Sequence, residues 1–255
     1  MDARFLIGCG LVGLLSSTVI AAPVYVTGVW DTDQVHILDE SFASLSSFSV
    51  GSGTSNPNGI TAYNQYIYSG HFNTREIIAY NFAGVEQFRW SDSRLNGLQG
   101  LTFIGNELAV ASSGQIHLFN PFSGAFSRSF SSQGSSVEGI AFDGTSLWQL
   151  VDANIYETNV TDGSLLSTIV NAADSCNFDG TGIANVDANQ LALGCTNGDV
   201  YVVSKATGVI NNSFDNDLNM YGLSRFNVPE PVSLSLFGLG LFGLGLSHKK
   251  RKSIA

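Results

Sequence analysis

Short apolar runs, not long amphipathic stretches, dominate the middle of the chain. In one unit, the runs LTFI, ELAVAS, QIHLFN and AFSRSF follow one another between residues 101 and 130. Turn-forming sequences such as Gly105-Asn106 and Ser113-Gly114 separate them. This pattern predicts short β-strands joined by tight turns. Apolar and polar positions alternate only partly, which predicts strands that are buried on both faces.

The same pattern of strands repeats along the chain. A glycine followed by isoleucine or leucine recurs at intervals of 41, 39, 43 and 40 residues. The five pairs are Gly59-Ile60, Gly100-Leu101, Gly139-Ile140, Gly182-Ile183 and Gly222-Leu223. A second repeated strand appears as QVHILDE, EIIAYNF, QIHLFNP, NIYETNV and DVYVVSK. A period of this length without helical periodicity predicts propeller blades or a solenoid.

The two ends of the repeat region complement each other. Residues 24–50 contain the second, third and fourth strands of a unit, and residues 221–226 contain only a first strand. Together they would make one composite blade that closes the ring without an open sheet edge at the seam. We therefore predict an all-β fold, a five-bladed β-propeller with a composite closing blade over residues 23–227. An open β-sandwich or a β-solenoid is the alternative.

The N-terminus has the pattern of a secretory signal peptide. Arg4 precedes an apolar run from Phe5 to Leu15, and the small residues Ala21 and Ala22 offer a cleavage site. We expect signal peptidase to remove residues 1–22, since the run is too short for a spanning helix. A competing pattern around Cys9 resembles the acylation box of bacterial lipoproteins, but no adequate apolar run precedes this cysteine.

The C-terminus, residues 228–255, combines three features in a fixed order. It begins with the tetrapeptide Val228, Pro229, Glu230 and Pro231. An uncharged stretch from Val232 to Ser247 follows. As a helix it would measure roughly 24 Å, slightly less than a typical hydrocarbon core. The basic residues Lys249, Lys250, Arg251 and Lys252 complete the tail. We expect a single transmembrane helix with its basic end in the cytoplasm and the propeller outside.

This arrangement resembles the PEP-CTERM sorting signal of Gram-negative bacteria. The resemblance covers about the last 28 residues. It implies recognition and removal of the tail by an exosortase, then release to the cell surface or the extracellular matrix. It also implies a link to exopolysaccharide and biofilm production. A plain single-pass anchor is the alternative.

Charge limits the partners of the remaining domain. Residues 22–229 contain six Lys and Arg side chains against nineteen Asp and Glu side chains. A domain this acidic does not bind nucleic acid through its phosphates. Anionic phospholipid surfaces would also repel it, so we expect contact with the membrane only through the C-terminal helix before processing. Neutral polysaccharides, divalent cations and basic partners remain compatible.

Two cysteines remain after removal of the signal peptide, Cys176 and Cys195. Export permits a disulfide between them, and the predicted strand pairing brings their neighbourhoods close together. The alternative is a pair of buried free thiols. Two cysteines alone do not make a zinc site.

The residue before each repeat glycine is polar, and the inner strand of a propeller blade lines the central channel. These residues are Asn58, Gln99, Glu138, Thr181 and Tyr221. We expect all five near one mouth of the channel, where they would hold a water chain, a metal ion or sugar hydroxyls. The alternative is that they only satisfy the backbone of a wet channel.

We predict no catalytic residue and no cofactor. The acidic turns at Asp179-Gly180 and Asp215-Asn216-Asp217 would suit a calcium ion. The functional hypothesis is an exported, non-enzymatic propeller that binds polysaccharide or another surface protein. One alternative is a propeller enzyme that acts on glycans or lactones at the channel mouth. Another is a structural matrix protein without a specific ligand.

Overall fold

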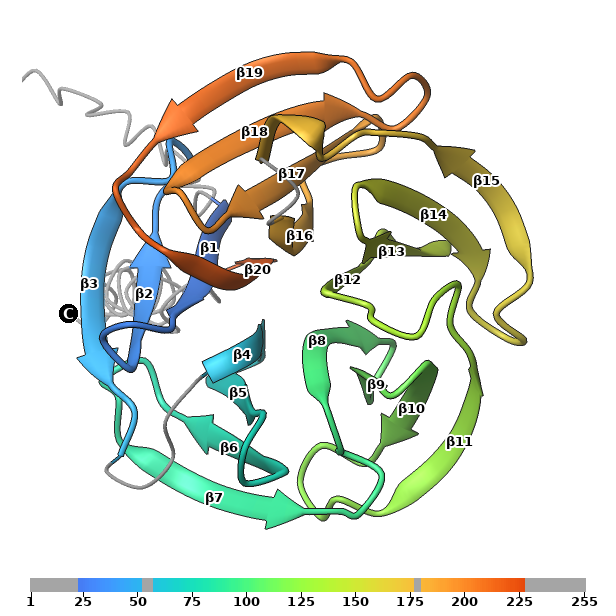
Figure 1. Cartoon of the computed structure of the whole chain (residues 1–255). Helices are drawn as coiled ribbons and strands as arrows, with labels where there is room; N and C mark the ends of the chain where they lie inside the picture. Colours follow the sequence, from blue (N-terminus) through green and yellow to red (C-terminus); the bar gives the residue numbers. More distant parts are fainter. Residues whose placement is uncertain (1–22, 52–56, 177–179, 228–255) are drawn as a thin grey trace, which may run out of the picture. The chain divides into compact units, whose positions relative to one another are not determined.

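Twenty β-strands in the described residues form five four-stranded antiparallel sheets around one axis (Figure 1). The computed structural model describes residues 23–51, 57–176 and 180–227. All of these described residues belong to one compact unit. The all-β, five-bladed propeller predicted from the repeats is therefore confirmed. The predicted signal peptide, the tetrapeptide at 228–231, the membrane helix and the basic tail at 249–252 lie outside the described residues.

Each complete blade runs from an inner strand near the axis to an outer strand at the rim (Figure 1). The first contains β4 (Pro57–Tyr63), β5 (Tyr66–His71), β6 (Glu76–Tyr80) and β7 (Glu86–Ser91). The second contains β8 (Leu98–Ile104), β9 (Glu107–Ser112), β10 (Gln115–Phe119) and β11 (Phe126–Ser131). The third contains β12 (Gly139–Phe142), β13 (Ser146–Val151), β14 (Asn154–Asn159) and β15 (Leu165–Ile169). The fourth contains β16 (Gly180–Asn185), β17 (Gln190–Cys195), β18 (Asp199–Ser204) and β19 (Ile210–Asp215).

The closing blade joins the two ends of the domain, as the sequence predicted. Its strands, from the axis outward, are β20 (Met220–Asn227), β1 (Pro23–Val29), β2 (Gln34–Leu38) and β3 (Ser44–Ser49). In this pairing Thr27 lies opposite Leu223. The Thr27 hydroxyl also donates a hydrogen bond to the Gly222 carbonyl at 2.7 Å. Strands from opposite ends of the chain therefore hold the ring shut.

Apolar side chains fill the interfaces between neighbouring blades. Val26 packs with Ile60 between the closing blade and the first blade. Trp148 and Leu150 pack with Ile183 between the third and fourth blades. Both faces of each sheet are thus covered, which explains why apolar and polar positions alternate only partly along the strands.

The repeat glycines bring the inner strands together at the axis. A Cβ atom on Gly182 would lie 2.7 Å from the backbone nitrogen of Leu223 in the next inner strand. The other repeat glycines pack against the following blade in the same way. Side chains cannot fit at such distances, so glycine is required for this close approach. The repeat glycines are therefore an architectural feature of the ring.

The described residues contain one short 3-10 helix, η1 (Asp174–Cys176), which precedes the fourth inner strand. Within the described ranges, no helix has both the length and the apolar character needed to cross a membrane.

Candidate binding site

The five polar residues that precede the repeat glycines line one pocket. The pocket has a volume of about 260 Å³ and is also lined by Trp30 and Phe72. We call it the start mouth, because the inner strands begin there. The five residues that the structure brings together are Asn58, Gln99, Glu138, Thr181 and Tyr221. Each comes from a different blade, so the site depends on the whole ring.

The glycine ring explains why these side chains converge. Asn58 stands immediately before Gly59 in β4, and Thr181 immediately before Gly182 in β16. Since each glycine lies against the next inner strand, the residues on its N-terminal side are carried to the same end of the channel. The repeat that closes the propeller thus also builds the pocket.

Hydrogen bonds between neighbouring blades fix part of this polar ring. The Asn58 side-chain amide donates to the Leu98 carbonyl at 3.3 Å. The Thr181 hydroxyl donates to the Met220 carbonyl. These bonds orient the two side chains and use one donor of each.

Gln99 and Glu138 supply hydrogen-bonding groups at the same mouth. The Gln99 Oε1 atom accepts a hydrogen bond from the Ser136 hydroxyl at 3.3 Å. The backbone of Glu138 is held by a hydrogen bond from its amide to the Leu150 carbonyl at 2.9 Å. Among the described residues that line the pocket, Glu138 has the one carboxylate. The site therefore combines neutral amide groups with a single negative charge.

Aromatic side chains form another part of the pocket wall. Trp30 and Tyr221 lie with ring centroids 5.0 Å apart and planes inclined by 38°. Phe72 is 38% exposed. Trp30 and Phe72 were not predicted at this mouth, although their positions in the repeat could have indicated it. Both residues come directly after the second strand of a blade, and this strand ends where the inner strand begins.

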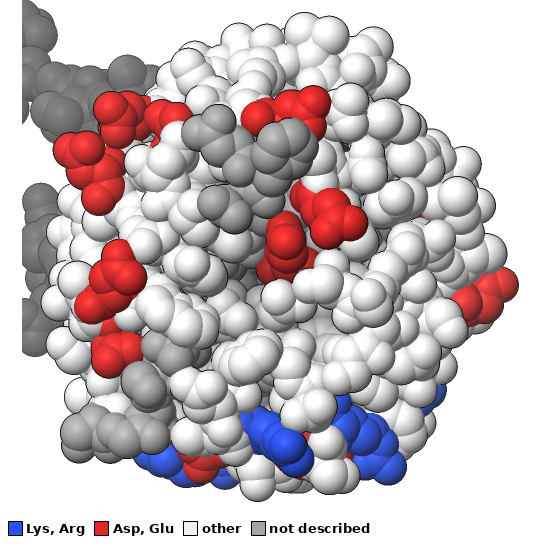
Figure 2. Space-filling view, viewed as in Figure 1, with Lys and Arg blue, Asp and Glu red and all other residues white. Residues whose placement is uncertain are grey.

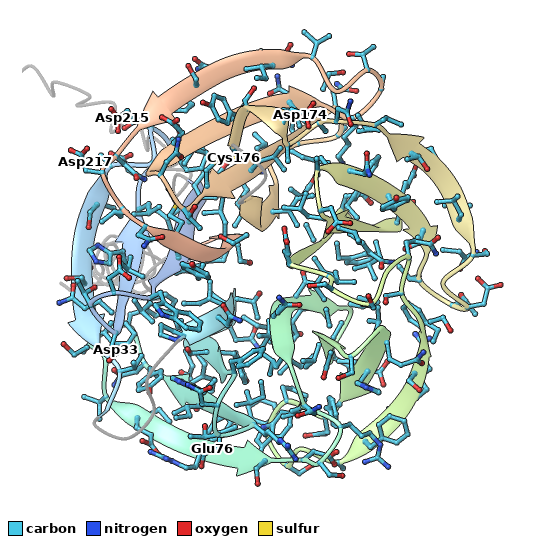
Figure 3. The ribbon with its side chains drawn as sticks, in the orientation of Figure 1. Asp33, Glu76, Asp174, Cys176, Asp215 and Asp217 are labelled. Carbon is cyan, nitrogen blue, oxygen red and sulfur yellow. A yellow bond between two sulfur atoms is a disulfide. The ribbon has the colours of Figure 1, made fainter. Side chains whose placement is uncertain are left out.

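A disulfide fastens the segment that leads into the fourth inner strand. Cys176 ends η1 and Cys195 ends β17, and their Cα atoms are 5.3 Å apart. Cys195 lies opposite Gly180, the first residue of β16. Figure 3 shows Cys176 over this blade. The bridge therefore ties η1 to β17, the strand that pairs with β16.

Acidic side chains outside the pocket do not form a metal-binding cluster in the part of the chain that the structure describes. Asp33, Asp215 and Asp217 lie toward the rim and not at the channel (Figure 3). Asp179, which like Asp215 and Asp217 was predicted to suit calcium, lies outside the described residues. Acidic side chains are spread over much of the face in Figure 2, while basic ones gather along the edge near β7. Calcium binding stays a prediction.

Comparison with known proteins gives one family match and supports the fold. Residues 227–252 match the model of the PEP-CTERM protein-sorting motif. Comparison with curated proteins finds no match. A protein of unknown function from Bacteroides caccae has a similar crystal structure, with a TM-score of 0.50 and 12% sequence identity. The similarity covers 76% of this chain and 73% of that protein, and at this identity it shows the fold alone.

The sorting motif implies processing by an exosortase and export to the cell envelope or surface. It begins at the last residue of β20, so the sorting region follows the closing strand directly. The chain is therefore an exported surface protein that carries a PEP-CTERM sorting motif behind a five-bladed β-propeller.

Proposed function

We propose that the propeller is a non-enzymatic binding module that holds a neutral sugar unit of an extracellular polysaccharide at the start mouth. The observation that carries this proposal is the pocket itself, in which Trp30 and Tyr221 of the closing blade stand beside amide, hydroxyl and carboxylate groups from the four other blades. Such a protein would take part in the exopolysaccharide matrix or biofilm of the producing bacterium.

The chemistry of the pocket suits a sugar. A sugar ring has apolar C–H faces, which pack on aromatic rings, and hydroxyl groups at its edge, which need hydrogen-bond partners. Trp30 and Tyr221 offer apolar surface, while Gln99 and Glu138 offer acceptors and donors at the same mouth. Binding pockets commonly combine apolar walls with a few directed polar groups. The Glu138 carboxylate and the acidic domain favour a neutral over an anionic ligand.

The pocket supports binding better than cleavage of a glycosidic bond. Most glycoside hydrolases need two carboxyl groups, separated by about 5 to 9.5 Å. Among the described residues that line the start mouth, Glu138 is the one with a carboxyl group, so the second member of such a pair is missing from this lining. We therefore favour a binding role over the alternative of a glycan- or lactone-active enzyme.

Export would proceed in two steps. Signal peptidase would remove residues 1–22, and the helix at 232–247 would hold the protein in the membrane until an exosortase cleaves the tail.

A variant that ends at residue 228 should appear in the extracellular fraction of a strain without exosortase. The full-length chain should stay with the membranes of that strain, as cell fractionation and immunoblotting would show. Finding both forms in the same fraction would contradict the anchor.

Binding is tested with the full-length protein in detergent micelles. Isothermal titration against a panel of neutral glucose, galactose and mannose oligosaccharides should identify at least one ligand. Trp30→Ala should weaken its binding roughly tenfold or more by removing the aromatic wall. Glu138→Gln should weaken it less, because it keeps the shape of the side chain. Phe122→Ala is the matched control, since Phe122 is an aromatic residue, 54% exposed, that does not line this pocket.

Two results would overturn the proposal. One is a complete absence of binding by the whole panel and by polysaccharide purified from the producing matrix. The other is a ligand whose affinity is the same for the wild type, Trp30→Ala and Phe122→Ala, which would place binding elsewhere on the molecule.

A further inference from the structure

A second cavity lies toward the other end of the inner strands and has the opposite charge. Its volume is about 180 Å³, and it is lined from β8, β12, β16 and β20. We call it the end mouth. Its polar lining includes Thr102, Asn185, Ser224 and Arg225. The start mouth contains a carboxylate, whereas the end mouth contains a guanidinium group.

Arg225 lacks the counter-charge that most cations of the domain have. Arg89 and Lys205 lie 2.5 Å and 2.8 Å from a carboxylate oxygen. Arg225 is half-buried, and no carboxylate of the described residues forms an ion pair with it within 4.0 Å. Among the described residues, the other cation without such a pair is Arg75, which is exposed to solvent. A partly desolvated charge is unfavourable unless an opposite charge accompanies it.

The hydrogen bonds of Arg225 leave one edge of the guanidinium group unused. Its Nη1 atom donates to the Val186 carbonyl. Its Nε atom is buried and has no hydrogen-bond partner in the described part of the chain. Nε and Nη2 form the side edge of the group, whose two parallel N–H bonds match the two oxygens of a carboxylate. An unpaired buried donor of this kind points to a missing ion or water.

Asn185 and Thr102 add hydrogen-bonding groups to the same cavity. The Asn185 Oδ1 atom is buried without a partner among the described residues. The two orientations of an amide exchange oxygen and nitrogen, so Nδ2 can occupy this position and donate. The Thr102 hydroxyl accepts a hydrogen bond from the Phe142 amide at 3.3 Å, and its own proton is free for another acceptor. Three inner strands thus contribute donors to one cavity.

The surroundings of the cavity combine apolar walls with charged side chains of both signs. Burial raises the pKa of the Tyr25 hydroxyl, Arg225 acts to lower it, and the Glu40 and Asp187 carboxylates act to raise it, so charges of both signs lie near this blade interface. Ile140, Ile183 and Phe226 provide apolar walls. Electrostatic interactions are stronger next to such walls than in water.

We infer that the end mouth binds a carboxylate group, with Arg225 as the charged partner and Asn185 and Thr102 as additional donors. A single guanidinium matches a single negative charge. The acidic domain disfavours ions with two negative charges, such as sulfate. The carboxylate is that of a sugar acid or of a small organic acid. The site is separate from the sugar pocket that contains Glu138, so its test does not depend on the proposed function.

The test measures the thermal midpoint of the full-length protein in detergent micelles at constant ionic strength. The probes are sodium acetate, sodium glucuronate and sodium sulfate, with sodium chloride as the reference. Acetate and glucuronate should raise the midpoint of the wild type above its value in chloride. A larger effect of glucuronate identifies a sugar acid, and an equal effect identifies a small organic acid.

Two variants locate the effect. Asn185→Asp should weaken carboxylate binding roughly tenfold or more, because its own carboxylate would pair with Arg225. The same variant should have a higher midpoint than the wild type without any probe, which also shows that it folds. Arg75→Gln removes an exposed positive charge and is the matched control, so its response should equal that of the wild type.

The proposal is overturned by any of three outcomes. The first is that neither carboxylate raises the midpoint of the wild type. The second is that sulfate raises it more than both carboxylates do. The third is that Asn185→Asp responds as the wild type does.

Discussion

Gly222 packs directly against Ile60. A Cβ atom on Gly222 would lie 3.0 Å from the backbone nitrogen of Ile60, in the first inner strand. Gly222 also has a φ angle of 80°, which glycine adopts readily and other residues rarely do. This contact joins the last inner strand to the first, so the ring of close glycine contacts is complete at the seam between the chain ends.

Replacing a glycine of the ring should destabilise the propeller. Gly182→Ala places a Cβ atom 2.7 Å from the Leu223 backbone nitrogen, so the inner strands must move apart. We expect the free energy of unfolding to fall by about 1–3 kcal/mol, measured by chemical denaturation. Gly51→Ala is the control, because a Cβ atom there meets nothing within 4 Å. Equal stability of the two variants would contradict the crowding argument.

Removing the last strand should open the ring. A chain that ends at residue 227 retains β20 and should show one cooperative unfolding transition. A chain that ends at residue 219 lacks β20, so β1 loses its inner neighbour and Gly182 loses its contact with Leu223. We expect that shorter chain to lose the cooperative transition and to aggregate, because its exposed strand edge can pair with other chains. A native-like thermal transition in the shorter chain would show that the seam is dispensable.

Asp143 and Lys205 form a nearly buried ion pair between the third and fourth blades. Lys205 Nζ lies 2.8 Å from Asp143 Oδ2, and the two side chains are 8% and 12% exposed. The Trp148 indole N–H donates to the same oxygen at 2.8 Å. Replacing one member leaves the other charge without a partner, so Asp143→Asn should cost roughly 3 kcal/mol at neutral pH. Glu86→Gln, in the exposed pair with Arg89, should cost less than about 1 kcal/mol.

The same pair predicts a dependence of stability on pH. Burial alone would raise the pKa of Asp143, but the Lys205 ammonium and several N–H donors hold it well below its ordinary value of 3.8. Because the pKa is lower in the folded state, the stabilisation is present above about pH 4 and is lost as the pH falls below it. Denaturation curves between pH 7 and pH 3 should therefore be less pH-dependent for Asp143→Asn than for the wild type. Parallel curves for both proteins would refute this role.

The disulfide between Cys176 and Cys195 should contribute measurably to stability. A reductant should lower the free energy of unfolding of the wild type by about 3 kcal/mol, because the unfolded chain gains freedom when the loop opens. The double variant Cys176→Ala and Cys195→Ala should be less stable than the wild type and insensitive to the reductant. If the reductant shifts both proteins equally, its effect does not come from this bridge.

The repeat carried most of the information needed to predict the fold. The glycine spacing located the inner strands, and the incomplete units at the two ends predicted the composite blade that pairs Thr27 with Leu223. The candidate site was less accessible to prediction. The polar residues before the glycines were predicted to share one mouth, whereas Trp30 and Phe72 were not placed there because they lie outside the inner strands.

The sequence by itself determined the number of blades, the seam and the sorting motif, because each is a local pattern repeated along the chain or placed at its end. Only the tertiary structure decided which side chains share a cavity. Trp30 meets Tyr221, and Arg225 reaches Val186, because the ring brings together strands that are distant in sequence. Periodicity gives the face and position of a residue within its blade, but neighbours across blades depend on how all the sheets pack around the axis.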